Sequence, residues 1–338
     1  MSSGPPLGAA FQAPKHTYSA ENYIEDFFRK RPTDGQFKGY DVLNLKPSQG
    51  LNDTPANLSP LVFTYNESPS SVMPMINNLS MTVSLRLTDA ATKQKPADNE
   101  VVSVSNNILN TLFNDIDVMI NGQNVNKKTE KEQHYISTIG RYLSYNTAVK
   151  STVLTSGGWV EDDPETKEDW AEDSTAALSC VAFMERRSNF TEVKDGTKFR
   201  KGVVRFIGTV DYELSSLPSG IPPGMKCVFT FHQTKHAIRI CQPKDVVKTY
   251  YLTIEDMILH LPICHLSENS YVKLRKQLNV TPAKLHYTRS DLRNYVIKKG
   301  ATQYSGANLF QNSIIPVRVY VAFVDHDAFM GNVNKDPF

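Results

Sequence analysis

Two histidines four residues apart come closer to a metal-site pattern than anything else in this sequence. His232 and His236 lie in FTFHQTKHA, and Cys241 follows shortly after them. A zinc site needs neutral imidazoles and a thiolate that converge tetrahedrally on the ion. On a strand, residues four apart share one face, so both imidazoles would project the same way. The polar face of a strand produces the same pattern, and we favour that interpretation.

A second histidine–cysteine group and an acidic segment are the next candidates. Cys264-His265 follows His260, and we interpret this group as polar positions of a strand as well. Residues 161–173, EDDPETKEDWAED, could offer carboxylates to calcium. They lack the D-x-[DN]-x-[DN]-G spacing and the terminal glutamate of a calcium loop. We therefore predict an exposed, solvated loop there.

Asp325, His326 and Asp327 invite a catalytic interpretation, because a histidine beside a carboxylate can act as a general base. Adjacent residues on a strand point to opposite faces, so these side chains would not share one site. The sequence has no Walker A loop, no G-x-G-x-x-G after a strand, no H-E-x-x-H and no G-x-S-x-G. We predict a protein that is not an enzyme, without catalytic, cofactor-binding or metal-binding residues.

The elements that would position these residues are mostly strands. Segments rich in Val, Ile, Tyr, Phe and Thr are bounded by clusters of Pro, Gly, Asn and Asp, as in antiparallel sheets. No alternation of strands with helices appears, which argues against a parallel sheet. We predict an all-β protein with a few connecting helices, one at residues 131–145, and with strands at residues 61–65, 81–87, 116–120, 203–214, 225–240, 247–260 and 314–324.

Residues 101–126, VVSVSNNILNTLFNDIDVMINGQNVN, are the most informative stretch. Asn121-Gly122 between two β-prone runs predicts a type I′ turn, because both central residues of that turn need positive φ angles. Upstream, Ile108, Leu109 and Leu112 belong to one helical stripe. The stretch therefore predicts a hairpin preceded by a short helix.

Composition narrows the class of protein. The chain has 338 residues, of which 40% are hydrophobic and 21% charged, enough for two domains or one large β architecture. A net charge of +2 argues against a principal nucleic-acid coat, so any contact with nucleic acid would be indirect. We find no signal-peptide pattern, no run long enough to span a membrane and no disulfide framework among the four cysteines. We expect a soluble, reduced chain made inside a cell.

Five motifs follow one another along the chain. They are NNILNTLFNDIDVMINGQNV, HYISTIGRYLSYNTAVKSTVLTSGGW, FMERRSNFTEVKDGTKFR, LPSGIPPGMKCVFTFHQTKHAIRI and VRVYVAFVDHDAFMGNVNKDPF. Each resembles the corresponding stretch in capsid proteins of Polinton (Maverick) elements and adintoviruses, and the order is the same. The last is the strongest match, with Val-Asp-x-Asp-Ala-Phe-x-Gly and a final Asn-x-x-Pro-Phe. The resemblance covers most of residues 35–338.

The resemblance implies a double jelly-roll major capsid protein, built from antiparallel β-sandwiches. Three subunits would form a pseudo-hexameric capsomer, and capsomers would join minor or vertex proteins in the icosahedral shell of a virion. It implies a first jelly roll with insertions at 35–243 and a partial second roll at 244–338. From the residues themselves we predict a flexible arm and a docking helix at residues 1–34, where Tyr23, Ile24, Phe27 and Phe28 share one helical face; a helix that merely covers a sheet would show the same pattern. No cofactor is implied.

The end of the sequence departs from the family. Its members continue with further strands after the motif that here ends at Phe338. We expect a truncated chain, a second roll completed by another polypeptide, or a degenerate second roll. A half-built roll would leave open sheet edges, and open edges recruit strands from neighbours.

Two other functions stay open. A minor or vertex capsid protein with a single jelly roll would form no second sandwich from residues 246–338. A domesticated cellular β-sandwich binding protein is the other. A trimer in solution would favour the major capsid protein, a pentamer the vertex protein and a monomer the binding protein.

Overall fold

A computed structural model describes residues 35–51, 58–66, 71–97, 99–125, 132–163, 169–190, 203–302 and 316–338. The predicted arm and docking helix at residues 1–34 lie outside the described residues. The strands are β1 (Phe37–Leu45), β2 (Leu61–Tyr65), β3 (Val72–Pro74), β4 (Ser80–Asp89), β5 (Ser103–Val104), β6 (Phe113–Ile120), β7 (Gln123–Asn124), β8 (Val203–Thr209), β9 (Cys227–Gln233), β10 (Ile240–Cys241) and β11 (Tyr250–Leu266).

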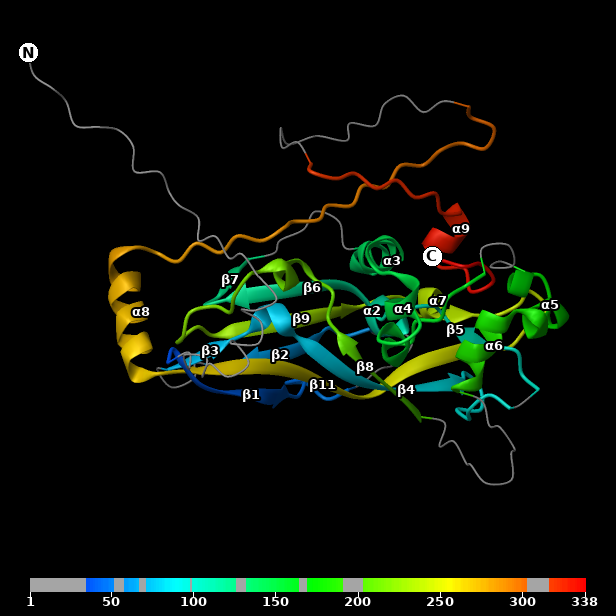
Figure 1. Cartoon of the computed structure of the whole chain (residues 1–338). Coiled ribbons are helices and arrows are strands. Elements are labelled where there is room, and N and C mark those ends of the chain that lie inside the picture. Colours follow the sequence, from blue (N-terminus) through cyan, green and yellow to red (C-terminus); the bar gives the residue numbers. More distant parts are fainter. Residues whose placement is uncertain are drawn as a thin grey trace, which may run out of the picture.

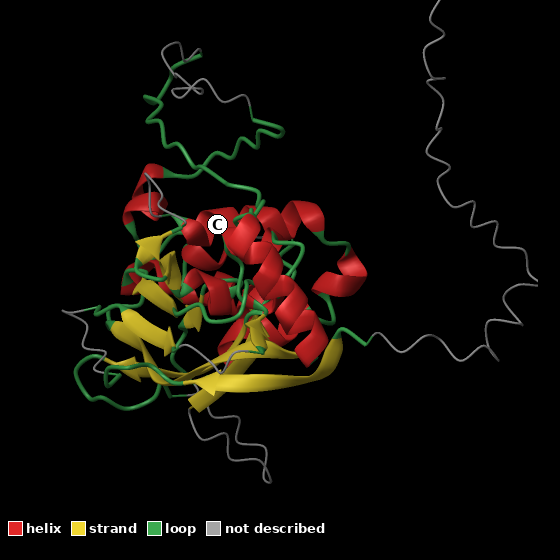
Figure 2. Ribbon diagram, turned by 90° about the vertical axis from the view of Figure 1, so that its left-hand side faces the viewer, coloured by secondary structure: helices red, strands yellow, loops and turns green. Residues whose placement is uncertain are grey.

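Short helices connect the strands. The α-helices are α2 (Ile108–Thr111), α3 (Gln133–Ser144), α4 (Thr147–Lys150), α5 (Ser174–Ser179), α6 (Val181–Ser188), α7 (His236–Arg239), α8 (Glu268–Val280) and α9 (His326–Met330). The 3₁₀ helices are η1 (Ile76–Asn78), η2 (Leu154–Gly157), η3 (Asp169–Ala171) and η4 (Glu213–Ser216). Most of them gather at one end and along one side of the sheets (Figures 1 and 2).

Two antiparallel sheets form the body of the molecule (Figure 1). The first has the order β1-β11-β4-β8, with β3 also paired to β11, and the second has the order β2-β9-β6-β7. A two-stranded ladder of β5 and β10 lies beside them. All pairings are antiparallel. The prediction of an all-β antiparallel sandwich with short connecting helices is confirmed.

The core lies between the facing sheets. Buried and half-buried residues alternate along β2 and β9, as the period of two in a strand requires. Phe231 of β9 is fully buried and makes edge contacts with Phe63 and Phe113, with ring centroids 5.5 and 5.0 Å apart. The same apolar cluster includes Val83 and Leu85 of the opposite sheet. Each such side chain contributes about 1.5–3 kcal/mol when it is fully buried.

The hairpin forms as predicted. Asn121 and Gly122 have φ angles of 49° and 81°, so both central residues are left-handed, as in a type I′ turn. The helical stripe upstream becomes α2, in which Ile108 and Leu109 are buried. The helix predicted at residues 131–145 is also confirmed, as α3.

Several predicted strands have other limits in the structure. The strand expected at residues 203–214 ends at Thr209, and the one expected at 225–240 ends at Gln233, where the chain turns into α7. The strand predicted at 314–324 is wrong for its described part, because residues 316–324 have no paired strand among the described residues. β-propensity alone does not make a strand, since the ladder needs a partner.

The acidic segment is less exposed than predicted. Trp170 lies in η3, is fully buried and stacks on Phe183 of α6, with ring centroids 5.5 Å apart. Asp162 is buried as well. The prediction of a wholly exposed loop is therefore wrong for Asp162, Trp170 and Ala171, which are buried. Trp170 packs on an aromatic ring and Asp162 pairs with the Arg186 guanidinium.

β11 follows the predicted domain boundary at residues 243/244 and pairs with β1, β3 and β4, which precede it. After β11, described residues 267–302 and 316–338 hold α8 and α9 and no strand. The domain limits and the second roll stay predictions. No helix in the described part of the chain has the length and apolar character required to cross a membrane.

Candidate functional site

The structure separates the first candidate metal group. His232 lies on β9, His236 begins α7 and Cys241 lies on β10. Among the described residues these three do not form a cluster of possible metal ligands. The assumption that His232 and His236 share one strand face is wrong, because β9 ends between them. Burial raises the pKa of the Cys241 thiol to about 12, so a thiolate is disfavoured at neutral pH.

The group around Cys264 consists of separate contacts between strands. His260 lies between Thr82 and Asn44, with a ring nitrogen 2.7 Å from a side-chain oxygen of each. His265 lies 2.9 Å from an Asp41 carboxylate oxygen on β1. Because each ring faces a different partner, the two histidines do not converge on one ligand.

Asp325, His326 and Asp327 are at the start of α9, not on a strand as predicted. The Asp325 carboxylate accepts a hydrogen bond from the backbone N–H of Asp327 at 2.8 Å and caps the helix. The Lys335 ammonium lies 2.6 Å from the Asp325 carboxylate, and this hydrogen bond is the first cause that lowers the pKa of Asp325. Capping and ion pairing account for these residues without catalysis.

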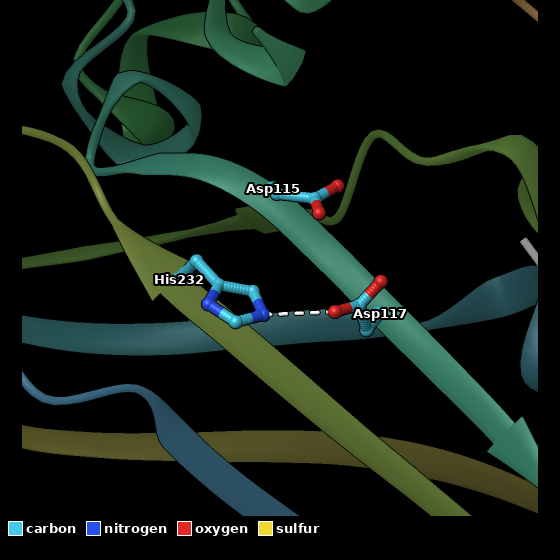
Figure 3. A group of neighbouring side chains, drawn as sticks. All are labelled: Asp115, Asp117 and His232. Carbon is cyan, nitrogen blue, oxygen red and sulfur yellow. Dashed lines mark hydrogen bonds and ion pairs between the residues drawn. The ribbon is translucent and has the colours of Figure 1, made fainter. Parts of the chain in front are cut away.

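One cluster of possible metal ligands occurs in the described part of the chain, and the sequence did not predict it. Asp115 and Asp117 of β6 and His232 of β9 offer ligand atoms that lie within 4.8 Å of one another (Figure 3). A register shift between Phe113 and Asp115 places Asp115 opposite His232, and Asp117 follows on the same face. Only the pairing of the two strands could reveal this arrangement.

The chemistry of this cluster is satisfied without a metal. The His232 imidazole lies 2.8 Å from an Asp117 carboxylate oxygen, which ties up one nitrogen that could bind a metal. One Asp115 oxygen accepts the backbone N–H of Ile116 at 2.9 Å. Opposite charges on adjacent strands stabilise a sheet by themselves. We therefore interpret the group as a cross-strand contact, and the absence of a metal site stays a prediction.

A buried polar cluster lies under the helices. The Arg186 guanidinium donates to one Asp162 oxygen at 2.6 Å, and the Asn106 amide donates to the other at 2.8 Å. Burial alone would lower the pKa of Arg186, but Asp162 beside it outweighs this and the pKa is raised. An ion pair of this kind holds α6 against the loop before η3. Burial also raises the pKa of the neighbouring Cys241 thiol to about 12.

A groove of about 260 Å³ runs between α3, η4 and residues 288–290. Inside it Asp211 accepts from the Arg141 guanidinium at 2.6 Å and from the Ser137 hydroxyl at 2.7 Å. The Ser290 backbone N–H donates to Glu213 at 3.3 Å. The groove thus binds a segment of the chain itself, and its charges are paired internally.

Comparisons with known proteins give likeness in structure only. No protein-family model matches the chain, and no curated protein matches it in sequence. A solved structure of the Sputnik virophage is 12% identical with a TM-score of 0.47, over 79% of this chain and 54% of that one. The mavirus major capsid protein is 12% identical, with a TM-score of 0.36 over 78% and 53% of the two chains.

The Faustovirus major capsid protein is 9% identical, with a TM-score of 0.38 over 74% of this chain and 58% of that one. This chain therefore spans about half the length of the proteins that it matches. Likeness at this level carries no conclusion about what this chain binds or assembles.

Proposed function

We propose that this protein is a structural capsid protein, a major capsid protein of the Polinton and adintovirus type that assembles as trimeric, pseudo-hexameric capsomers. The observation that carries the proposal is the set of five ordered motifs. Within the described residues, these motifs form framework elements: the first contains α2, β6 and β7, the second α3, and the fourth β9. Residues that shape the framework are those that a shared fold would retain.

The chemistry of the surface agrees with a structural role. Asp325 and Asp327, the carboxylates of the candidate catalytic group, are both paired with Lys335. The net charge of +2 gives no strong nucleic-acid-binding field. Partners would be other copies of the chain and minor or vertex proteins, and the location would be the virion. A symmetric assembly needs self-complementary surfaces and no reacting groups.

The solution mass tests this proposal first. Light scattering coupled to gel filtration is expected to give three subunits, and electron microscopy is expected to show shells at high protein concentration. Deleting residues 1–30 is expected to leave trimers intact and to block shells, because the arm would tie capsomers together. A stable monomer that never forms shells would contradict the proposal.

One observation favours a second candidate, the minor or vertex capsid protein. The described residues contain one sandwich, and β11 completes its first sheet without opening another. A single roll is what a vertex protein would need. A pentamer in the same light-scattering measurement would select this candidate.

A further inference from the structure

Positive charge is concentrated in one stretch of the chain. Residues 267–302, which comprise α8 and the chain that follows it, carry eight Lys and Arg against two Asp and Glu, a net charge of +6. The whole chain carries +2, so the residues outside this stretch together carry −4. We call residues 267–302 the basic segment. The average charge, from which only indirect contact with nucleic acid is expected, does not describe it.

Most of the positive charge in the basic segment is unpaired. Arg293 pairs with Asp291 at 3.0 Å. The other basic side chains are exposed and form no ion pair among the described residues; they are Lys273, Arg275, Lys276, Lys284, Arg289, Lys298 and Lys299. In the sandwich, by contrast, Arg86 lies 2.8 Å from the Glu255 carboxylate.

Ordinary helix stabilisation does not explain the basic residues of α8. The helix has one acidic residue, Glu268 in its first turn, so its basic residues lack the acidic partners that a solvated helix commonly places three or four residues away. Its last turn contains no basic residue, so these charges do not complement the helix dipole either.

The fold holds the basic segment against the sandwich. The Tyr287 hydroxyl donates to Val125 O at 2.7 Å, and the Thr288 N–H donates to the Ser216 hydroxyl at 2.8 Å. In Figure 1, α8 stands at one end of the sandwich, and residues 281–302 (orange) run from it along the side on which β7 and α3 lie. The positive charges are therefore presented from anchored chain along one end and one side of the molecule.

Any partner of the basic segment has to supply negative charge. Packing a neutral or apolar surface over unpaired ammonium and guanidinium groups would strip them of water without compensation, which is strongly unfavourable. A nucleic-acid duplex meets the requirement, because it carries one negative charge for about every 1.7 Å of its axis.

The aromatic and apolar residues of the segment favour a duplex over a single strand or a membrane. Proteins that bind single strands stack the bases on exposed aromatic rings. The segment contains no Phe or Trp, and its tyrosines, Tyr271, Tyr287 and Tyr295, are half-buried. A helix that lies in a membrane surface needs a free apolar face. The apolar stripe of α8, which consists of Tyr271, Leu274 and Leu278, is half-buried against the protein.

We propose that residues 267–302 bind the phosphate backbone of double-helical nucleic acid through charge, without reading its sequence. Contacts of this kind position a duplex and carry no base specificity. The inference goes beyond the proposed function and requires neither trimers nor shells.

Fluorescence anisotropy with the full chain and a labelled DNA duplex of arbitrary sequence, about 30 base pairs long, tests the proposal. The Kd is measured between about 50 and 300 mM KCl. Each phosphate that a cation neutralises adds about 0.9 to the slope of log Kd against log [KCl], so a slope of about 5–6 is expected for six or seven contacts.

Two variants with the same net charge locate the binding surface. The first combines Lys273→Gln, Lys276→Gln, Lys284→Gln and Arg289→Gln. It is expected to lower the slope by about 3–4 and to raise the Kd at about 100 mM KCl by at least about 100-fold. The control removes four exposed lysines outside the segment by combining Lys38→Gln, Lys46→Gln, Lys226→Gln and Lys244→Gln. It is expected to leave the slope and the Kd nearly unchanged.

Three results would overturn the inference: no binding of the duplex by the wild type at about 50 mM KCl, a slope below about 2, or equal weakening in the two variants. Binding of vesicles that contain phosphatidylserine, without binding of the duplex, would also overturn it and would assign the segment to a membrane surface.

The outcomes for the two proposals are distinct. A trimer that forms shells and binds no duplex would remove the nucleic-acid contact and leave the capsid role standing. A monomer that never forms shells but binds the duplex through the basic segment would do the reverse.

Discussion

The sandwich and the segment after β11 are built from the same kinds of residue and end in opposite environments. Phe231 on β9 is fully buried between two rings, whereas Phe323 is 84% exposed. α8 has no buried residue at all, although its 13 residues include Val272 and Leu274. In Figure 1 this helix stands at one end of the sandwich.

The difference shows what burial depends on in this protein. A strand becomes part of a core when a second strand pairs with its backbone and an opposite sheet covers its face. Residues 37–266 contain both kinds of partner, and residues 317–324 have neither within the described part of the chain. Both regions are thus apolar, and they differ in whether a pairing strand and a covering sheet are present to bury them.

Truncating one aromatic ring in each region gives the largest expected contrast. Phe231→Ala is expected to lower the free energy of unfolding by about 3–5 kcal/mol, because a cavity replaces a ring in the core. Phe323→Ala is expected to change the free energy of unfolding of an isolated chain by less than about 0.5 kcal/mol. Urea denaturation measures both, and comparable losses would contradict the contrast.

Arg186→Met sharpens the contrast between buried and exposed ion pairs. The substitution leaves the Asp162 carboxylate buried without its cation. We expect the free energy of unfolding to fall by about 3–5 kcal/mol. The double variant Asp162→Leu with Arg186→Met is expected to recover most of it. Lys335→Met, which removes the exposed partner of Asp325, serves as the control and is expected to change stability little. Thermal unfolding of the wild type, the single variant, the double variant and the control measures these differences in stability.

His134 predicts a dependence of stability on pH. It is 1% exposed, and burial lowers its pKa from 6.5 to about 3 even though Glu132 lies 3.3 Å away. The folded protein then keeps His134 neutral while the unfolded chain binds a proton, so stability falls as the pH drops from about 6.5 towards 3. This group contributes a slope of up to about 1.4 kcal/mol per pH unit.

His134→Phe is the matched variant for that prediction. Denaturation at pH 7, 6 and 5 is expected to show a steeper fall for the wild type than for the variant. Equal slopes would mean that the histidine is charged in the folded state.

Asn334→Ala tests the side-chain contact that holds the C-terminal residues against the loop after β10. The variant loses the two hydrogen bonds from the Asn334 amide to the backbone oxygens of Gln242 and Pro243, so a local destabilisation of about 1–2 kcal/mol is expected. Hydrogen exchange is expected to quicken at residues 326–338 and to stay unchanged in β9. Faster exchange in both places would mean that the two regions unfold as one unit.

Asp117→Asn is expected to have the smallest effect. Asp117 and His232 have side chains that are 24% and 26% exposed, and partly solvated pairs contribute about 0–1 kcal/mol. Calorimetric titration with Zn²⁺ is expected to show no binding by the wild type. Binding that Asp117→Asn abolishes would turn this cross-strand contact into a metal site.

Local patterns predicted the local structure well. The run at residues 61–65 matches β2, the Asn-Gly pair forms its turn, and the stripe at residues 131–145 forms α3. These features depend on backbone sterics and side-chain periodicity within a few residues. The same reasoning wrongly placed His236 on a strand. The end of β9 depends on contacts with distant strands, and a local pattern does not contain them.

The candidate sites depended on register and packing. Asp115 meets His232 through a bulge in β6, and Asp162 meets Arg186 across the helices. Nothing in their spacing along the chain signals either contact. The Cys241 thiol, a possible ligand by residue type, lies on β10 and is not part of the cluster that Asp115, Asp117 and His232 form.

The β class, the hairpin and the lack of recognisable catalytic motifs follow from the amino-acid sequence, because strand periodicity, turn sterics and motif spacing are local properties. Which apolar runs enter the core and which polar residues meet follows from the tertiary fold. Burial and ion pairing require partners from distant parts of the chain, and for residues 317–324 the described chain holds no such partner.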